Sequence, residues 1–274
     1  MAKARKQAIK PIVLAGAGRM GGALLKGWLA AGLGPIIVIE PHPSAALKAL
    51  ARKKAVTLVA APSQVAAKTV AACVVAMKPQ ILRTEAAALA DIAGPKGALM
   101  ISIAAGTTLA AMVKAWGRRA RIVRAMPNTP GAIGAGITGL YAPKAVTAAQ
   151  RAAAARLLAA LGQTVWVAKE SLIDSVTAVS GSGPAYLFAM AEALTEAGVA
   201  EGLPRAQAEQ FARATVAGAG ALLAADKAPA SALREAVTSP GGTTAAALAV
   251  LMPELRGLMR RTVHAARKRA EELH

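Results

Sequence analysis

Short runs of β-branched and other large apolar residues alternate with helical segments along the N-terminal part of the chain. The strand-like runs fall at residues 12–15, 35–40, 56–59, 70–77, 98–103, 121–126 and 164–168. Between them, apolar residues recur with helical spacing near residues 19–31, 44–53, 63–67, 80–92, 107–116 and 147–161. Strands separated by helices of this length are typical of right-handed crossovers, and they predict a mostly parallel sheet covered on both faces.

The pattern changes after Ala168. No further β-rich run follows, and the remaining apolar residues recur with helical spacing between Gly and Pro interruptions. These interruptions fall at residues 181–184, 202–204, 227–229, 239–242 and 252–253. We therefore predict an α/β domain over residues 1–168 followed by an all-α domain over residues 169–274.

The composition limits how the helices pack. Hydrophobic residues make up 55% of the 274 residues, but 73 residues are alanine and only seven are aromatic. Packing must therefore rely on close approach between backbones rather than on large side chains. The one cysteine, Cys73, excludes a disulfide framework and a cysteine-rich metal site, and it fits a reducing compartment. No two histidines are spaced to share a metal on one helical face, so we predict no metal site.

The formal charge of +19 raises the question of a nucleic-acid partner. Residues 1–10 contribute +4 and residues 256–274 another +4, while the other basic residues are scattered along the chain. A nucleic-acid surface would show basic residues clustered with aromatic side chains or a recognisable reading motif. Because neither is present, we predict no nucleic-acid partner, and we keep a nucleotide-sensing or nucleic-acid-binding protein as the non-enzymatic alternative.

The longest uncharged stretches do not predict a membrane protein. Residues 125–143 and 236–253 are both interrupted by Pro, Gly and Thr, so neither is a credible bilayer span. The apolar run that follows the basic N-terminus is too short for a signal peptide. We therefore expect a cytoplasmic protein with no membrane partner.

A glycine-rich loop follows the first expected strand. Residues 16–21 read Gly-Ala-Gly-Arg-Met-Gly, with the next helix starting inside the motif. In such a loop the first Gly permits a tight turn, the second lets the backbone approach a pyrophosphate, and the third allows the helix to pack on the strand. The context therefore predicts a Rossmann-type dinucleotide-binding domain, although a glycine-rich turn without a ligand shares the spacing.

Glu40 ends the second expected strand, where dinucleotide-binding domains place the side chain that reads the ribose. A carboxylate there accepts hydrogen bonds from ribose hydroxyls and repels a 2′-phosphate, which favours NADH over NADPH. The alternative is that the Pro41–Ser44 loop turns Glu40 away, so that His42, Ser44 or Arg52 meets a phosphate.

Two segments rich in Gly, Ser and Thr precede helices of the C-terminal domain. They are residues 180–186, Ser-Gly-Ser-Gly-Pro-Ala-Tyr, and residues 237–244, Val-Thr-Ser-Pro-Gly-Gly-Thr-Thr. Free N–H groups and hydroxyls at a helix N-terminus can bind a small carboxylate without a cationic side chain. Ordinary helix capping by Ser and Thr uses the same residues, but two such segments after a dinucleotide fold favour a substrate pocket.

Five strings together resemble the pyrroline-5-carboxylate reductase family. They are the loop at 16–21, Met-Lys-Pro-Gln at 77–80, Arg-Ala-Met-Pro-Asn-Thr-Pro at 124–130, and the segments 180–186 and 237–244. The resemblance covers the chain from about Ile12 to Ala266. It implies reduction of the C=N bond of 1-pyrroline-5-carboxylate to L-proline, the last step of proline biosynthesis, with NADH or NADPH as the cofactor. It also implies homodimers interlocked through the helical domain, often assembled into larger rings.

The resemblance also implies site residues. The cofactor would be bound by Gly16, Ala17, Gly18, Arg19, Met20, Gly21, Ala76, Met77, Lys78, Pro79, Ile103, Ala104, Ala105 and Asn128, with Glu40 at the ribose. The backbone N–H groups of Gly242, Thr243 and Thr244 would bind the substrate carboxylate, with Gly183 and Val237 shaping the pocket. The Thr244 hydroxyl would face the ring nitrogen as the catalytic group. Glu40 departs from family members that carry a small polar residue there.

Neither substrate segment contains Lys, His, Asp or Glu. Reduction of a carbonyl needs a proton donor for the developing alkoxide, whereas an imine can arrive protonated and leave as an amine. A β-hydroxyacid dehydrogenase or related imine reductase of the same two-domain plan is the enzymatic alternative. The dehydrogenases place a catalytic lysine where this chain has Leu187.

Overall fold

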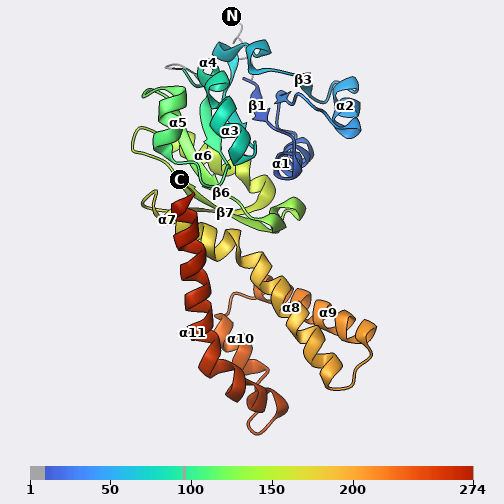
Figure 1. The fold of residues 1–274 in the computed structure, drawn as a ribbon. Coiled ribbons are helices and arrows are strands. Elements are labelled where there is room, and N and C mark those ends of the chain that lie inside the picture. The colour runs from blue at the N-terminus through green and yellow to red at the C-terminus, as the bar shows by residue number, and fades with distance from the viewer. Residues whose placement is uncertain (1–9, 95–96, 274) are drawn as a thin grey trace, which may run out of the picture. The chain divides into compact units, whose positions relative to one another are not determined.

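The computed structural model describes residues 10–94 and 97–273, so the basic N-terminus that the sequence singled out lies outside the described residues except for Lys10. Eight strands form one sheet in the order β3-β2-β1-β4-β5-β6-β7-β8 (Figure 1). The strands are β1 Ile12–Ala15, β2 Ile36–Ile39, β3 Thr57–Val59, β4 Ala72–Val75, β5 Leu99–Ser102, β6 Arg121–Met126, β7 Gly136–Tyr141 and β8 Gly162–Trp166. The predicted α/β class with a mostly parallel sheet is confirmed.

Strands β1 and β4 are neighbours in the sheet although β2 and β3 lie between them in sequence. After β3, at one edge of the sheet, the chain therefore crosses back to place β4 beside β1. This reversal of strand order leaves a crevice at the carboxyl ends of the strands, where open α/β sheets bind their ligands. The loops that follow β1, β4 and β5 therefore emerge side by side at one edge of the sheet.

Strand β7 has no counterpart among the predicted strands. It pairs antiparallel with β6, whereas β8 pairs parallel with β7. Its sequence, Gly-Ile-Thr-Gly-Leu-Tyr, contains two glycines, and strand-like patterns are weak where glycine interrupts them. Gly139 is nevertheless required there, because a Cβ at this position would lie 2.6 Å from Cγ1 of Val176.

Helices and short 3-10 turns cover both faces of the sheet. The helices of this part of the chain are α1 Arg19–Ala30, α2 Ala45–Arg52, α3 Pro79–Glu85, α4 Ala90–Ala93, α5 Leu109–Trp116, α6 Ala148–Leu158 and α7 Leu172–Val176. The helix expected at 63–67 is two 3-10 turns, Pro62–Gln64 and Ala67–Thr69, and the one expected at 80–92 is broken by a 3-10 turn at Ala86–Leu89.

The core consists of two buried clusters, one on each face of the sheet. Trp28 on α1 anchors the first cluster, where it is fully buried and its indole N–H donates to the carbonyl of Leu157 at 2.7 Å. Trp116 on α5 belongs to the second cluster, and its indole N–H donates to Ala86 at 2.8 Å. Burying each large ring together with a satisfied polar atom fixes the helices against the sheet.

Cys73 lies on β4 in the second cluster and is fully buried. Burial raises the pKa of its thiol to about 12. The thiolate is the reactive form, so we expect the native protein to resist alkylation by iodoacetamide at pH 8 and to take up one label per chain once denatured. Mass spectrometry of the labelled chain checks this, and rapid labelling of the native protein would contradict the buried position.

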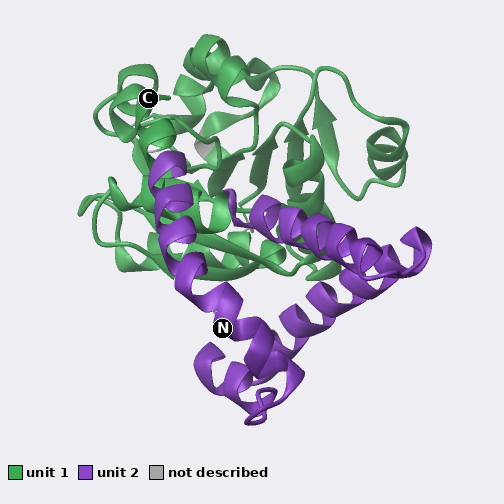
Figure 2. Cartoon of the chain, turned by 60° about the horizontal axis from the view of Figure 1, so that its bottom comes forward, with its two compact units in different colours: residues 1–181, 267–274 green, residues 182–266 purple. Residues whose placement is uncertain are grey.

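Two compact units make up the chain (Figure 2). Unit 1 contains the sheet, runs to Gly181 and includes the last residues from Arg267, whereas unit 2 contains residues 182–266. This division lies later than the boundary expected between 168 and 169. The reason is that α7 and the π-helix Thr177–Gly181 that continues it pack with β6 and β7 in unit 1.

Unit 2 is helical, as the sequence predicts. Its helices are α8 Gly183–Ala200, α9 Arg205–Ala225, α10 Ala230–Ala236 and most of α11 Thr243–Glu272. The interruption expected at 252–253 is wrong, because α11 runs through Pro253. Proline removes one helical N–H bond and crowds the carbonyl four residues earlier, but residues with high helix propensity on both sides (Ala, Leu and Met before it, Glu, Leu, Arg and Met after it) favour the helix. Within residues 10–94 and 97–273, no helix combines the length and apolar character that a bilayer crossing needs.

Candidate functional site

The glycine loop turns sharply at the end of β1. Gly16 has a φ of +92° and its N–H donates to the carbonyl of Ile39 at 3.0 Å. A Cβ on Gly21 would overlap the carbonyl oxygen of Gly16, so the first turn of α1 lies directly on the loop. The first and third glycines therefore fulfil the tight turn and the close helix packing that the motif predicts.

Gly18 shows a different requirement. Its backbone is extended, with φ −66° and ψ −163°, a conformation open to any residue, and a Cβ there would meet nothing within 4 Å. Gly18 precedes α1 as its N-cap without a side-chain hydrogen bond, and the first turn of α1 carries no acidic residue. No side chain caps the N–H groups of the first turn, and they lie at the positive end of a helix dipole, which fits a pyrophosphate.

A cavity of about 460 Å³ adjoins this loop. Six of the residues proposed to bind the cofactor line it, namely Gly16, Gly18, Glu40, Ala76, Met77 and Lys78. The lining also includes His42, which the sequence offered as an alternative phosphate contact. Two further lining residues, Ile81 and Glu85 of α3, were not predicted from the sequence. Their spacing of four on a helix that begins just after Lys78 was the available signal, since such residues share a helical face.

Glu40 accepts two backbone hydrogen bonds, one at each carboxylate oxygen. Oε2 accepts from the N–H of Ala17 in the glycine loop at 2.9 Å, and Oε1 accepts from the N–H of His42 at 3.1 Å. The carboxylate is therefore fixed at the mouth of the loop, and the loop after β2 does not turn it away. Arg19 and Met20 begin α1, with Arg19 exposed and Met20 partly buried.

The other proposed cofactor residues follow β4, β5 and β6, which are neighbours in the sheet. Pro79 begins α3, Ile103 and Ala104 are buried, and Ala105 is half-buried. Asn128 is half-buried after β6, and its side-chain oxygen accepts from the N–H of Ile137 at 3.0 Å. The Asn128 side-chain oxygen thus holds the start of β7, and the NH₂ group of the same amide is the part that could bind a ligand.

The substrate segments belong mainly to unit 2. Gly183 starts α8, and a Cβ there would meet nothing within 4 Å. The turn before α11 is tight, with φ +71° at Gly241 and the N–H of Gly242 donating to Ser239 at 3.0 Å. Thr243 and Thr244 are the first residues of α11, and Val237 is 62% exposed. These features place free helix N–H groups and the Thr244 hydroxyl in the first turn of α11.

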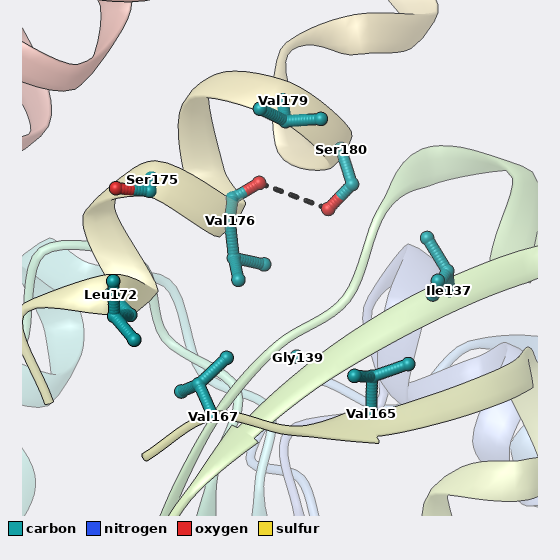
Figure 3. Close-up of a pocket in the computed structure, with 9 residues that line it drawn as sticks. All are labelled: Ile137, Gly139, Val165, Val167, Leu172, Ser175, Val176, Val179 and Ser180. Atoms are coloured by element: carbon teal, nitrogen blue, oxygen red, sulfur yellow. Dashed lines mark hydrogen bonds between the residues drawn. The ribbon is translucent and has the colours of Figure 1, made fainter. Parts of the chain in front are cut away.

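Ser180 begins the first substrate segment and lines a second pocket, of about 340 Å³, which is formed by unit 1 and open to solvent (Figure 3). Its hydroxyl donates to the carbonyl of Val176 at 2.9 Å. The other lining residues are Ile137, Gly139, Val165, Val167, Leu172, Ser175, Val176 and Val179. Apart from Ser175 and Ser180, these lining residues are apolar or glycine, so the pocket offers few polar side chains to a dinucleotide or a carboxylate.

Comparison with known proteins gives the same two parts. Residues 170–273 match the family described as pyrroline-5-carboxylate reductase dimerisation, and residues 11–106 match NADP oxidoreductase coenzyme F420-dependent. The pyrroline-5-carboxylate reductase of Synechocystis sp. is 42% identical over 239 residues, which is 87% of each chain.

Two solved structures are also similar. The structure of a pyrroline-5-carboxylate reductase from Coxiella burnetii has a TM-score of 0.88 and 37% identity, covering 96% of this chain and 98% of that one. The Plasmodium falciparum pyrroline carboxylate reductase, solved with NADP bound, has a TM-score of 0.78 and 25% identity, with the same coverage. On its sequence, its two domains and its fold, the chain belongs to the pyrroline-5-carboxylate reductase family.

Proposed function

We propose that the protein reduces the C=N bond of 1-pyrroline-5-carboxylate to L-proline with NADH or NADPH. The observation that carries this proposal is the unfilled space at Gly18 before the first turn of α1, close to the hydrogen-bonded carboxylate of Glu40, in a chain of this family. The test follows the absorbance of NADH and NADPH with pyrroline-5-carboxylate and with its six-membered homologue. Oxidation of neither cofactor with the five-membered imine would refute the proposal.

The chemistry needs positioning more than proton transfer. A bound nicotinamide supplies a hydride, and the protonated imine carbon is already electrophilic enough to accept it. The two substrate segments offer N–H groups and hydroxyls but no titratable side chain. Holding the ring carbon in a reactive position can lower the barrier by roughly 7–11 kcal/mol in favourable cases, so these groups suffice for the proposed reaction.

Thr244 is proposed as the residue that orients the ring and stabilises the amine product by a hydrogen bond. Replacing Thr244 with alanine should lower kcat/KM, with a loss of about 1–3 kcal/mol in transition-state stabilisation, the effect of losing one hydrogen bond to a charged group. Steady-state kinetics with saturating cofactor measure this loss. Thr262→Val on the same helix is the matched control, because the Thr262 hydroxyl only donates to the carbonyl of Leu258. Full activity of Thr244→Val would contradict the role.

NADH is the proposed preferred cofactor. The Glu40 carboxylate is held by the N–H groups of Ala17 and His42, at the position from which a dinucleotide-binding domain reads the ribose. A 2′-phosphate placed near it would meet a fixed negative charge. The relative from Plasmodium falciparum was solved with NADP, so the preference is proposed for this chain alone.

The protein is a homo-oligomer, on the evidence of its dimerisation domain. We propose that the helical domain forms a homodimer. Large apolar side chains on its helices are exposed, including Phe188 on α8 at 64%, Phe211 on α9 at 61% and Val250 on α11 at 78%. Exposed apolar surface of this kind marks association sites. Larger rings, the absence of a nucleic-acid partner and a cytoplasmic location stay predictions from the sequence.

A further inference from the structure

A buried arginine lies in unit 1 beside the segments proposed to line the cofactor and substrate. Arg124 is on β6 and only 2% of its surface is exposed. Its Nη1 lies 3.0 Å from Oε1 of Glu170, and its Nη2 lies 3.5 Å from Oδ1 of Asp174. Asp174 is buried as well, at 3% exposure. The sequence predicts no role for Arg124 beyond its place in the string at 124–130.

Burial makes this arrangement specific. A charge removed from water is costly unless it is paired and hydrogen-bonded, and removing one partner leaves the other uncompensated. The planar guanidinium can bond two carboxylates at once with fixed directions, which a lysine ammonium cannot reproduce. The network therefore holds β6 and α7 in one relative position rather than in a range of positions.

The network reaches a third segment through Glu170. The same Oε1 that faces Arg124 accepts the N–H of Leu109, the first residue of α5, at 2.7 Å. α5 follows directly on the proposed cofactor residues Ile103–Ala105 and the left-handed turn at Gly106, whose φ is +65°. In the sheet, Arg124 is also the register partner of Ser102, the last residue of β5. One guanidinium thus links the segments after β5 to α7.

The segments that the network fixes lead into the proposed site. β6 ends at Met126 and continues to Asn128, and α7 continues as the π-helix that ends at Gly181. A Cβ on Gly181 would lie 2.7 Å from Cε of Met126, so these two ends are in contact. On its other side α7 packs on β7, where Val176 faces Gly139 (Figure 3). Because α7 runs directly into the π-helix, a shift of α7 would move Ser180 and Gly181 with it.

We infer that Arg124, held between Glu170 and Asp174, is a positioning residue that sets the start of the first substrate segment relative to the cofactor-lining residues 103–105. The inference rests on the proposed function. Arg124 is only 2% exposed and lines neither of the two cavities described above, so we infer that it acts on cofactor and substrate through the segments it fixes.

The kinetic test compares Arg124→Met and Asp174→Asn with the wild type at 15 °C, after circular dichroism has shown that each variant is folded at that temperature. Each variant should lose at least tenfold in kcat, while the NADH dissociation constant from fluorescence titration stays within twofold. The double variant should be no worse than the poorer single variant, because the two residues act as one unit. A kcat within twofold of the wild type in a folded variant would overturn the inference.

Arg151→Met is the matched control. Arg151 is a half-buried arginine of the same unit that donates to the carbonyl of Ala142 at 2.7 Å and stacks over Trp166. Its replacement should lower the melting temperature but leave kcat within twofold of the wild type. An equal loss of kcat in Arg151→Met would show that Arg124 acts through stability alone and would overturn the positioning role.

Hydrogen exchange keeps the inference separate from the proposed function. Without substrate, Arg124→Met and Asp174→Asn should speed exchange of the amides in residues 105–110 and 172–181 at least tenfold, whereas Arg151→Met should not. If the wild type fails to reduce pyrroline-5-carboxylate while this exchange pattern holds, the proposed function is wrong and the positioning of these segments stands. Unchanged exchange in both segments refutes the positioning itself.

Discussion

Replacing Glu40 with serine is expected to raise kcat/KM for NADPH about a hundredfold relative to that for NADH. Two like charges about 6 Å apart repel by roughly 3 kcal/mol at an effective dielectric constant near 20. The Glu40 carboxylate accepts from the N–H groups of Ala17 and His42, so swinging away to relieve that repulsion would break both hydrogen bonds. Serine removes the charge and offers a hydroxyl to a phosphate. Steady-state kinetics with each cofactor at a saturating imine concentration measure the ratio.

Two further variants separate charge from shape. Glu40→Gln keeps the size of the side chain and an acceptor for the Ala17 N–H, so it should show most of the gain with NADPH. Glu85→Gln removes another carboxylate that lines the same cavity, and it should leave the ratio within threefold of the wild type. A wild type that already uses NADPH with much the higher kcat/KM would contradict the proposed role of Glu40.

Most of the fold could be predicted because its strands are short, apolar and separated by helices. β1 and β6 have the bounds that the pattern predicts, and the other predicted strands differ by a few residues at their ends. β7 was missed because Gly136 and Gly139 dilute its apolar pattern, and the reason for Gly139 is a contact with Val176 that lies far along the chain. The helix interruption predicted at Pro253 is wrong for the opposite reason. Proline is a strong local signal for the end of a helix, but α11 continues through it.

The candidate site was predictable where its chemistry lies in the backbone. Gly16 and Gly21 are required by the turn and by the close packing of α1, and Gly18 is expected to be needed only for the proposed pyrophosphate, so the spacing of the three glycines carries the information. The network of Arg124, Glu170 and Asp174 could not be predicted in this way. Glu170 and Asp174 lie 46 and 50 residues after Arg124 in the sequence. No local pattern shows that a charged residue is buried rather than exposed to water. Only the fold brings Arg124 to the two carboxylates.

Replacing Gly18 with valine should weaken NADH binding by at least a hundredfold, about 3 kcal/mol, without changing the free energy of unfolding by more than about 0.5 kcal/mol. The backbone at Gly18 is extended, and a Cβ there meets nothing within 4 Å, so the ligand-free fold tolerates the branched side chain. The proposed pyrophosphate needs that same space above the first turn of α1. Fluorescence titration with NADH and urea denaturation of the same samples measure the two quantities.

The neighbouring glycines make the result interpretable. A Cβ on Gly22 lies 3.7 Å from the carbonyl oxygen of Ala17, an ordinary contact, so Gly22→Ala should keep NADH affinity within twofold and stabilise α1 by about 0.5–1 kcal/mol. Gly21→Ala would overlap the Gly16 carbonyl and should lose both affinity and stability. If Gly18→Val instead bound NADH normally, the space above α1 would not hold the pyrophosphate. The glycine loop would then be a structural turn, and the site of hydride transfer would have to lie elsewhere.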